Sequence, residues 1–308
     1  MKRMIVGFIE LIAVVYLRYV PIRYGKLAVW NRIIMRHFSW RNDESTAKTF
    51  FGAELTGSRR DFIHLHLKVF GVWEPSVTRY FQDTLRHGDV AIDVGANVGV
   101  HTLLFSHLVG PTGIVHAIEA SPSIFKRLEA NLAANHVGNV VAYNVAVVDV
   151  PGDVTVFLHD ESNLGGTTIV QAEAGRRGAH SEAVVRGQRL ADIVPTEDLR
   201  RARLIKIDVE GAEWPVLMGL KDALPSLAEN CDVLVEVTAS ALADFGASVS
   251  DVVALFAEYG FTAWRIPNEY RVEPYFERRP PAPEPLVSTD VELGDLLFRR
   301  APRGAVSA

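Results

Sequence analysis

Three groups of acidic residues and glycines give this sequence its chemistry, and each follows or ends an apolar run. The first group, Asp93, Gly95 and Gly99, comes at the end of the run Val90–Val94. β-Branched residues in such a run are typical of a buried parallel strand, and glycines let the following turn bring the backbone close to a ligand. A strand that ends in a carboxylate and a glycine turn predicts a binding site for a nucleotide-like cofactor.

The spacing of these glycines limits the choice of cofactor. Gly95 and Gly99 stand four positions apart, without the middle glycine of the Gly-x-Gly-x-x-Gly pattern that makes room for a pyrophosphate. A cofactor without phosphates fits this turn better. The sequence therefore disfavours an NAD-dependent oxidoreductase, which stays open as an alternative type of enzyme.

The second group is Glu119, which follows the apolar run Ile114–Ile118 and lies 26 positions after Asp93. In a doubly wound sheet this position falls at the carboxyl edge, beside the glycine turn. A carboxylate there can accept hydrogen bonds from both hydroxyls of a ribose. Folds that bind nicotinamide and folds that bind S-adenosylmethionine share this geometry, so the position alone does not choose between them.

The third group places three carboxylates within six residues, Asp208, Glu210 and Glu213, after the apolar run that begins at Leu204. Mutual repulsion in such a cluster raises the pKa of at least one member, which suits a general base or a group that meets a cation. The sulfonium of a methyl donor is such a cation. A purely helix-stabilising role for Glu213 near a first helical turn stays open.

These groups together resemble the FkbM family of S-adenosylmethionine-dependent methyltransferases. The resemblance covers about residues 71–237 and is carried by Asp93–Gly99, Ile118–Pro122, Val145–Val147 and Ile205–Glu213. It implies an α/β fold with a doubly wound, Rossmann-like, seven-stranded sheet and a reversed final hairpin. It also implies the cofactor S-adenosyl-L-methionine and O-methylation of a hydroxyl on a sugar, glycolipid or polyketide-type acceptor.

The resemblance implies roles for ten residues. Asp208 lies beside the methyl group, and it or Glu210 takes the proton of the acceptor hydroxyl, so these two are the expected catalytic residues. The expected cofactor-binding residues are Glu74, Asp93, Gly95, Ala96, Asn97, Gly99, Glu119 and Ala146.

We assign no metal ligand from the sequence. In one version that stays open, Asp208 binds a divalent cation that acidifies the hydroxyl, with Glu210 or Glu236 as a further oxygen ligand. His64 and His66 share a face of the strand expected over Asp61–Phe70, but catalytic zinc usually takes three protein ligands, and no third one is in view.

The elements that must position these groups alternate between strand and helix from Val90 onward, which predicts a parallel sheet with helices on both faces. The stretch from Gly152 to Arg189 is an expected antiparallel insertion that forms a lid or a substrate wall. The expected strands are Val90–Val94, Ile114–Ile118, Val140–Val147, Val154–Leu158, Thr167–Gln171, Ala183–Val185, Leu204–Asp208, Val233–Val237, Phe261–Arg265 and an edge strand Asp295–Arg299. The expected helices are Glu74–Arg86, Val98–Leu108, a helix capped by Ser121 that continues to Asn135, Glu213–Leu220 and Ser250–Tyr259.

Length and composition fit a globular protein. Of 308 residues, 48% are hydrophobic and 22% are charged, which leaves enough apolar surface for a large core. Cys231 is the only cysteine, so no disulfide within one chain can form, and we expect a cytoplasmic location. We expect an N-terminal helical, basic extension over 1–60, a methyltransferase domain over 61–300 and a flexible tail over 301–308.

The N-terminal region has a charge opposite to that of the rest. Residues 1–41 contain eight Lys and Arg residues and one acid, Glu10, or +7, which leaves −12 for the remainder of a chain of net charge −5. The apolar run Met4–Leu17 is shorter than the ~20 residues of a spanning helix, and the large residues Val15–Tyr19 do not resemble a signal-peptide cleavage site. Two interpretations stay open: a helix packed on the protein or on a second subunit, and a helix in the interface of an anionic membrane.

The partners follow from these features. We expect a small-molecule, glycan or lipid hydroxyl as acceptor, no nucleic acid, and peripheral membrane contact through residues 1–41 as an open alternative. A non-catalytic, membrane-associated binding module is the alternative outside enzymes. The sequence predicts neither the acceptor nor the oligomeric state.

Overall fold

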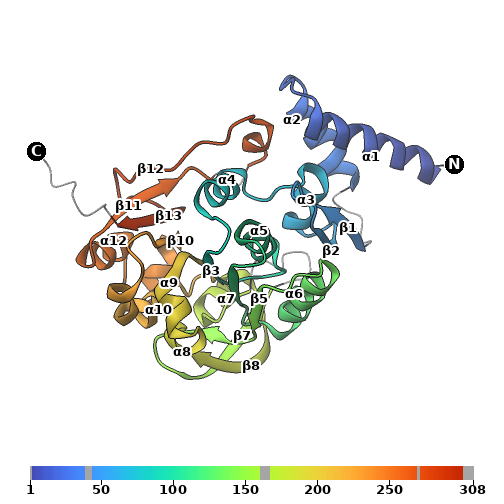
Figure 1. Cartoon of the computed structure of the whole chain (residues 1–308). Helices are drawn as coiled ribbons and strands as arrows, with labels where there is room; N and C mark the ends of the chain where they lie inside the picture. The colour runs from blue at the N-terminus through green and yellow to red at the C-terminus, as the bar shows by residue number, and fades with distance from the viewer. Residues whose placement is uncertain (1, 39–43, 160–166, 269–270, 301–308) are drawn as a thin grey trace, which may run out of the picture.

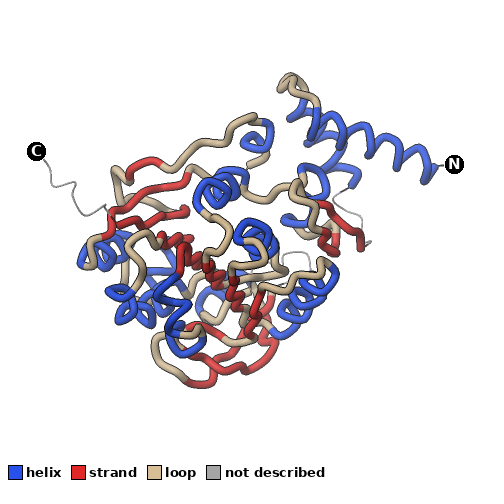
Figure 2. The backbone as a smooth tube through the Cα atoms, in the orientation of Figure 1, coloured by secondary structure: helices blue, strands red, loops and turns tan. Residues whose placement is uncertain are grey.

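The computed structural model describes residues 2–38, 44–159, 167–268 and 271–300 (Figure 1). The tail predicted for residues 301–308 lies outside the described residues. Strands of one large sheet cross the middle of the molecule with helices on both sides, and two smaller sheets lie at its periphery (Figure 2).

The central sheet has the strand order β12-β11-β13-β10-β9-β3-β4-β5. Five of its strands, β3, β4, β5, β9 and β10, pair in parallel, while β13 is antiparallel to both of its neighbours. Without the two-residue edge strand β12, this is the predicted seven-stranded, doubly wound sheet with a reversed final hairpin. The strands are β3 (Val90–Val94), β4 (Ile114–Ile118), β5 (Val140–Tyr143), β9 (Ala202–Ile207), β10 (Asp232–Thr238), β11 (Phe261–Ile266), β12 (Glu284–Pro285) and β13 (Leu293–Arg300).

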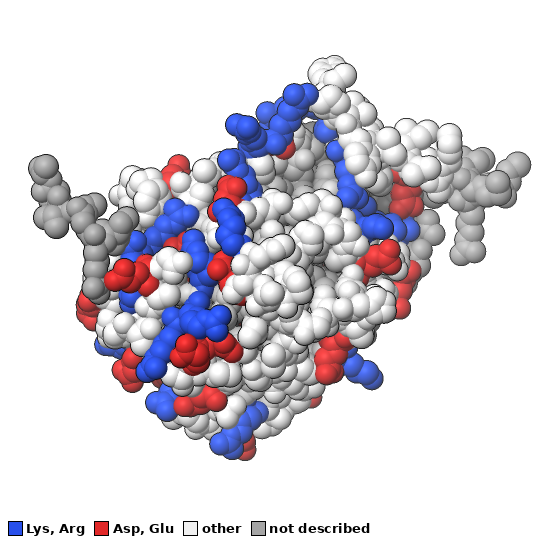
Figure 3. All heavy atoms as spheres, in the orientation of Figure 1, with Lys and Arg blue, Asp and Glu red and all other residues white. Residues whose placement is uncertain are grey.

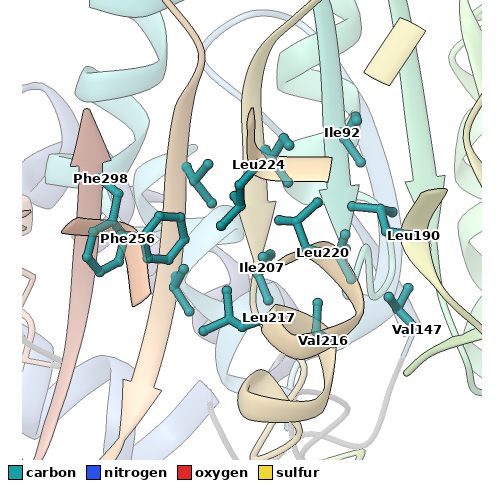
Figure 4. Close-up of a cluster of buried hydrophobic side chains, with 14 of the residues drawn as sticks. Ile92, Val147, Leu190, Ile207, Val216, Leu217, Leu220, Leu224, Phe256 and Phe298 are labelled. Atoms are coloured by element: carbon teal, nitrogen blue, oxygen red, sulfur yellow. The ribbon is translucent and has the colours of Figure 1, made fainter. Parts of the chain in front are cut away.

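Both faces of this sheet are covered, because successive residues of its strands enter different hydrophobic clusters. On β3, Ile92 contacts the cluster formed with α10 (Glu213–Leu220) and α12 (Val249–Glu258), whereas its neighbour Ala91 contacts the cluster formed with α4 (Pro75–Thr84) and α5 (Val100–Val109). Figure 4 shows the first cluster, in which the rings of Phe256 and Phe298 stack with centroids 3.8 Å apart. Burial on both faces explains why these strands read as continuous apolar runs.

The helices around the sheet begin and end near the residues that the sequence predicts. Ser121 caps α6, since its side chain accepts a hydrogen bond from the backbone N–H of Ile124. The helices are α4 (Pro75–Thr84), α5 (Val100–Val109), α6 (Pro122–Ala134), α8 (Leu190–Ile193), α9 (Thr196–Arg201), α10 (Glu213–Leu220), α11 (Ala239–Asp244), α12 (Val249–Glu258), and the 3-10 helices η3 (Lys221–Ser226) and η4 (Glu273–Phe276).

The expected strand Val140–Val147 is divided between two sheets. Its first half, β5, pairs with β4, and its second half, β6 (Ala146–Val147), pairs with β8 (His180–Gln188). Between them the side chain of Asn144 donates to the carbonyl oxygens of Glu119 and Ala120, which holds the turn. β7 (Gly152–Leu158) completes the second sheet, antiparallel to β8.

The prediction of a strand over Thr167–Gln171 is wrong. Thr168 forms only an isolated bridge with Phe157, and Gln171 begins the helix α7 (Gln171–Arg177). The prediction of an edge strand over Asp295–Arg299 is also wrong in its position. β13 lies between β10 and β11, and its centre, Leu296 to Phe298, is fully buried, as an internal strand requires.

The N-terminal region holds more than helices. It consists of α1 (Lys2–Tyr19), α2 (Lys26–Val29), the π-helix η1 (Trp30–Phe38), the hairpin β1 (Glu44–Lys48) and β2 (Glu54–Ser58), and α3 (Phe62–Phe70). α1 packs against α3, within the segment assigned to the methyltransferase domain. The boundary at residue 60 stays a prediction. Among the described helices, none combines the length and the apolar content needed to cross a membrane.

The expected strand Asp61–Phe70 is a helix. Asp61 caps it, since its carboxylate accepts a hydrogen bond from the backbone N–H of His64 at 2.7 Å, and Gly71 ends it with a φ of 73°. His64 and His66 are therefore buried residues of a helix and do not share the face of a strand. Apolar residues alternate with His64, His66 and Lys68 along this segment, which also fits a strand, so the capping residues and not the alternation identify the helix.

Candidate active site

A cavity of about 240 Å³ lies at the carboxyl ends of β3, β4 and β9. Parallel strands place their carboxyl ends at one edge of the sheet, which brings together residues distant in the sequence. Nine of the ten predicted site residues line this cavity: Glu74, Asp93, Gly95, Ala96, Asn97, Glu119, Ala146, Asp208 and Glu210.

The tenth residue, Gly99, is not among the residues that line the cavity. It precedes α5 with a φ of 93°, and a Cβ there would meet Leu128 Cδ1 at 2.7 Å. Gly95 is constrained from another side: its φ is 82°, and a Cβ would lie 1.7 Å from the carbonyl oxygen of Asp208. The two glycines thus allow close packing of the turn against α6 and β9.

Glu119 joins the turns that follow β3 and β4. One carboxylate oxygen accepts a hydrogen bond from the backbone N–H of Asn97 at 2.9 Å, and the other accepts one from Ser121 at 2.8 Å. Burial raises the pKa of Glu119 to about 7, against the effect of these two donors. Each carboxylate oxygen has a second lone pair, so the group retains acceptor capacity for ligand hydroxyls.

Lys206 forms a charge bridge between two strands. Its Nζ lies 3.0 Å from Asp208 Oδ2 and 3.7 Å from Asp93 Oδ1, and the hydroxyl of Thr102 donates to the other Asp93 oxygen at 2.6 Å. Burial alone would lower the pKa of Lys206, but the carboxylates of Asp208 and Asp93 raise it. Burial opposes ionisation of Asp208 as well, yet Lys206 lowers its pKa, so Asp208 carries a negative charge.

Further acids border Asp208 from the other side. The side-chain amide of Asn268 donates to Glu74 at 3.0 Å and to Asp295 at 2.9 Å. Burial, together with the nearby acids, raises the pKa of Glu74 and of Glu236 well above the ordinary range. Burial and the neighbouring acids favour the protonated forms of these two carboxyl groups, and a cation placed among them would favour their ionisation.

Glu210 meets an arginine from the insertion. Arg177 Nη1, at the end of α7, donates to Glu210 Oε2 at 2.7 Å. Burial raises the pKa of Glu210 to about 8; the charge of Asp208 adds to this rise and Arg177 opposes it. Glu213 instead holds the loop, because its Oε1 accepts hydrogen bonds from the backbone N–H groups of Val209 and Gly211 at 3.3 and 3.0 Å.

Three of these acids converge closely enough to ligate an ion. Asp208, Glu210 and Glu236 each offer a carboxylate oxygen, and the three atoms lie within 4.8 Å of one another. His64 and His66 belong to α3, where His64 contacts Ser45 Oγ and His66 contacts the carbonyl oxygen of Phe62.

Comparison with protein families decides the assignment. The model of the methyltransferase FkbM domain matches residues 93–263, more than half of the chain. The chain belongs to the FkbM methyltransferase family. The resemblance carried by the Asp93 turn and the Asp208 loop is thereby confirmed, and the oxidoreductase alternative loses its basis.

Named relatives of this FkbM chain act on different molecules. It is 32% identical over 205 residues to the 31-O-demethyl-FK506 methyltransferase FkbM of Streptomyces tacrolimicus, a match that covers 58% of this chain and 74% of that protein. It is 29% identical over 185 residues to the hexuronic acid methyltransferase AglP of Haloferax volcanii, covering 60% of this chain and 68% of that protein.

Solved structures related to this FkbM chain are more distant. They include the precorrin-6y C5,15-methyltransferase of Geobacter metallireducens, at 13% identity with a TM-score of 0.39, which covers 73% of this chain and 87% of that one. Another is the TYW2 protein of M. jannaschii in complex with AdoMet, at 12% identity with a TM-score of 0.40, covering 85% and 88%.

S-adenosylmethionine is the cofactor of this FkbM methyltransferase. The cavity fits it in the chemistry of its donors. Carboxylates around Asp208 suit the positive sulfonium and ammonium groups, Glu119 offers acceptors for ribose hydroxyls, and Ile118 and Val147 supply apolar walls for a base.

The sequence analysis gave no role to several residues of the FkbM site. Lys206 could have been found, because a lysine two positions before Asp208 on a buried strand must point to the same face. Trp73, the residue before Glu74, lines the cavity, and His101, whose pKa is lowered to about 3 by burial, lies 3.5 Å from Glu74. Arg177 left no signal, because only folding of the insertion brings it to Glu210.

Proposed function

We propose that this protein transfers the methyl group of S-adenosylmethionine to a hydroxyl oxygen of a small-molecule, glycan or lipid acceptor. The observation that carries the proposal is the convergence of Asp208 and Glu210 on the cavity that the Asp93 turn also lines. A carboxylate beside the methyl donor supplies what O-methylation needs from the protein, namely an acceptor for the hydroxyl proton. The names of the two relatives, a methyltransferase of O-demethylated FK506 and one of hexuronic acid, support an oxygen acceptor.

The residues of the turn would hold the cofactor. We assign the methionine and ribose portions to Asp93, Gly95, Ala96 and Asn97, and the ribose hydroxyls to Glu119. Ala146 would border the adenine. Glu74 would close the cavity near the methionine end, while Gly99 would act by letting the turn pack against α6. The bound cofactor supplies an electrophilic methyl group on a sulfonium.

Glu210 is the better proton acceptor of the two catalytic candidates. Its pKa of about 8 makes it the stronger base, whereas Lys206 keeps Asp208 ionised. Even so, a carboxylate is a weak base for an alcohol, so the proton leaves late, as the carbon–oxygen bond forms. Much of the acceleration would come from holding the hydroxyl in line with the methyl group. Asp208 would contribute its negative charge beside the sulfonium.

The insertion would form the acceptor side of the cavity. Thr167, Thr168 and Ile169 line the cavity from the segment before α7. Hydroxyl and apolar groups side by side suit a ligand that is itself partly polar, such as a sugar ring or a hydroxylated macrocycle.

Methyl transfer from labelled S-adenosylmethionine tests this proposal. Purified protein would be incubated with hydroxylated glycans, lipids and polyketides, and products would be identified by the mass of one added methyl. Asp208→Ala should abolish turnover while calorimetry still detects cofactor binding. Full turnover by this variant would remove Asp208 from the mechanism. Cofactor binding without turnover on any acceptor class would favour a non-catalytic binding module.

A divalent cation offers a second way to acidify the hydroxyl. The spacing of Asp208, Glu210 and Glu236 favours this version, since oxygen ligands of that kind suit Mg²⁺ or Ca²⁺. The Lys206 contact favours the metal-free version, because it already neutralises part of the charge on Asp208. We therefore propose that methyl transfer needs no metal ion. Turnover measured in the presence of a chelator tests this version.

A further inference from the structure

Helix α1 has an apolar face on each side. Its inner face buries Ala13 and Leu17 against α3 and η1. Its outer face exposes Phe8, Ile12 and Val15, which are 63%, 54% and 44% accessible and follow one another at intervals of four and three residues. This spacing places them in one stripe along the helix. Figure 1 shows α1 at the outer edge of the molecule, away from the central sheet.

The exposed stripe continues beyond the helix. Tyr19 at its end is 67% accessible, and Ile22 and Tyr24 in the following turn are 61% and 88% accessible. Single exposed apolar residues are ordinary on a protein surface, but a contiguous row of this length marks an interaction site.

The acidic residue of this helix does not interrupt the stripe. Glu10 Oε1 pairs with Arg59 Nη1 at 2.5 Å, and the two side chains are only 15% and 12% exposed. Glu10 is the single acid among residues 1–41. Because it is turned inward and paired, it adds no carboxylate to the outer face.

Basic residues flank the same face. Arg23, Arg32 and Arg36 are exposed on the turn and η1, with Arg23 Nη2 3.3 Å from Glu277 Oε1, whereas Arg18 turns its guanidinium toward the carbonyl oxygen of Lys48 at 3.5 Å. In Figure 3 the projecting N-terminal helix is mostly white, and blue side chains lie beside it. A surface with an apolar centre, tyrosines and basic flanks complements an anionic membrane interface.

We propose that the outer face of α1 and the turn to α2 bind the surface of an anionic lipid membrane. The apolar stripe would enter the boundary between head groups and acyl chains, and the arginines would meet the head-group phosphates. A second copy of the chain is the less suitable occupant, because two regions of charge +7 would face each other.

Vesicle flotation of the whole chain tests the proposal, and its readout does not depend on methyl transfer. We expect binding to vesicles of phosphatidylcholine with about 30% phosphatidylserine, weaker binding to phosphatidylcholine alone, and a decrease as salt is raised. The triple variant Phe8→Ser, Ile12→Ser, Val15→Ser should bind about tenfold more weakly or worse, since three apolar contacts are lost.

A matched control places the same change elsewhere. Val150, Val184 and Val287 are 73%, 64% and 96% accessible and lie outside the N-terminal region, so their triple change to serine should leave flotation unchanged. Circular dichroism would confirm that both variants fold. Equal flotation of the stripe variant and the wild type would overturn the proposal. A wild-type dimer in light scattering that becomes a monomer in the stripe variant would overturn it as well, by assigning the face to a second copy.

Discussion

Lys206 Nζ lies 3.0 Å from Asp208 Oδ2, on the same side of the sheet. Lys206 belongs to β9, and Asp208 follows the last residue of that strand. Lys206 also approaches Asp93 on the neighbouring strand, so one buried ammonium holds the ends of β9 and β3 together. The acid that follows β9 and the turn that follows β3 both line the cavity, so this contact links the two halves of the site, in addition to the backbone pairing of the two strands.

Removing this ammonium should destabilise the fold. Lys206→Met leaves Asp93 and Asp208 without their buried counter-charge, and we expect a loss of about 3 kcal/mol or more in the free energy of unfolding. Urea denaturation measures it. Lys126→Met, at an exposed position of α6, is the control and should change stability by less than about 0.5 kcal/mol. A Lys206 variant as stable as the wild type would show that the bridge contributes little.

The rate of methyl transfer should rise with pH. Glu210 must be ionised to accept a proton, and with a pKa of about 8 its ionised fraction increases from pH 6 to 9. Glu210→Gln should lower kcat about 100-fold and remove most of the rise of kcat with pH, the rising limb of the profile. The measurement is a profile of kcat at saturating cofactor. An unchanged profile in the variant would assign the limb to another group.

The arginine partner of Glu210 provides a finer test of the same limb. Arg177→Met removes the donor that opposes the rise, so the pKa of Glu210 should increase and the limb should move to higher pH. Arg176→Met is its matched control, because Arg176 pairs with Glu173 and Asp244 instead. Movement of the limb in both variants would argue against a specific effect of Arg177.

The positive charge of S-adenosylmethionine should make its affinity for the protein depend on pH. Burial and neighbouring acids raise the pKa of Glu74 and of Glu236, and a sulfonium would favour their ionised forms. S-adenosylmethionine should therefore gain affinity over the neutral S-adenosylhomocysteine by about tenfold as the pH rises from 6 to 8.5. Calorimetry with both ligands measures the ratio, and Glu74→Gln should reduce its slope. A ratio independent of pH would exclude coupling to these acids.

Stability without ligand should fall as the pH rises. The pKa of Glu213 is about 7 in the folded protein against 4.5 for the free group. Its contribution to the free energy of unfolding is therefore fully present below pH 4.5 and is lost as the pH rises through 7. Glu119 follows the same direction. We expect Tm to fall by about 3 °C or more between pH 5 and 8. Glu213→Gln keeps an oxygen for the two loop N–H groups and should make the fall smaller in a thermal scan.

Chelation separates the two versions of the mechanism. If Lys206 and Glu210 suffice, EDTA should leave turnover unchanged within about twofold. Loss of turnover in EDTA that Mg²⁺ or Mn²⁺ restores would instead make Asp208, Glu210 and Glu236 metal ligands. Glu236→Gln gives a second comparison, because it should remove metal activation but spare a metal-free enzyme.

Local signals explain what the sequence predicted well. The strands of the parallel sheet are short apolar runs with polar residues at both ends, and Val90–Val94 and Ile114–Ile118 match the structure residue for residue. The cap at Ser121 was equally readable, since a serine followed by proline is typical of a helix start. These same signals placed Asp93, Glu119 and Asp208 at one edge of the sheet.

The errors have two origins. At α3 the alternation of apolar and polar residues outweighed the local capping signals Asp61 and Gly71, which make the segment a helix. Elsewhere tertiary contacts decide the outcome. The place of β13 depends on pairing with β10 and β11, which lie distant in the sequence, and the Arg177–Glu210 contact depends on how an insertion folds back. Neither follows from a pattern read along the chain.

The close approach at Gly95 changes how its motif should be used to find relatives. The carbonyl of Asp208 occupies the space where a side chain at position 95 would stand, so the fold itself demands glycine there, with or without a methyl donor. A homologue that had lost its activity would still need this glycine to fold. Among distant relatives, glycine at position 95 therefore diagnoses architecture, whereas, under the proposed mechanism, acids at positions 119, 208 and 210 would be the better markers of a working enzyme.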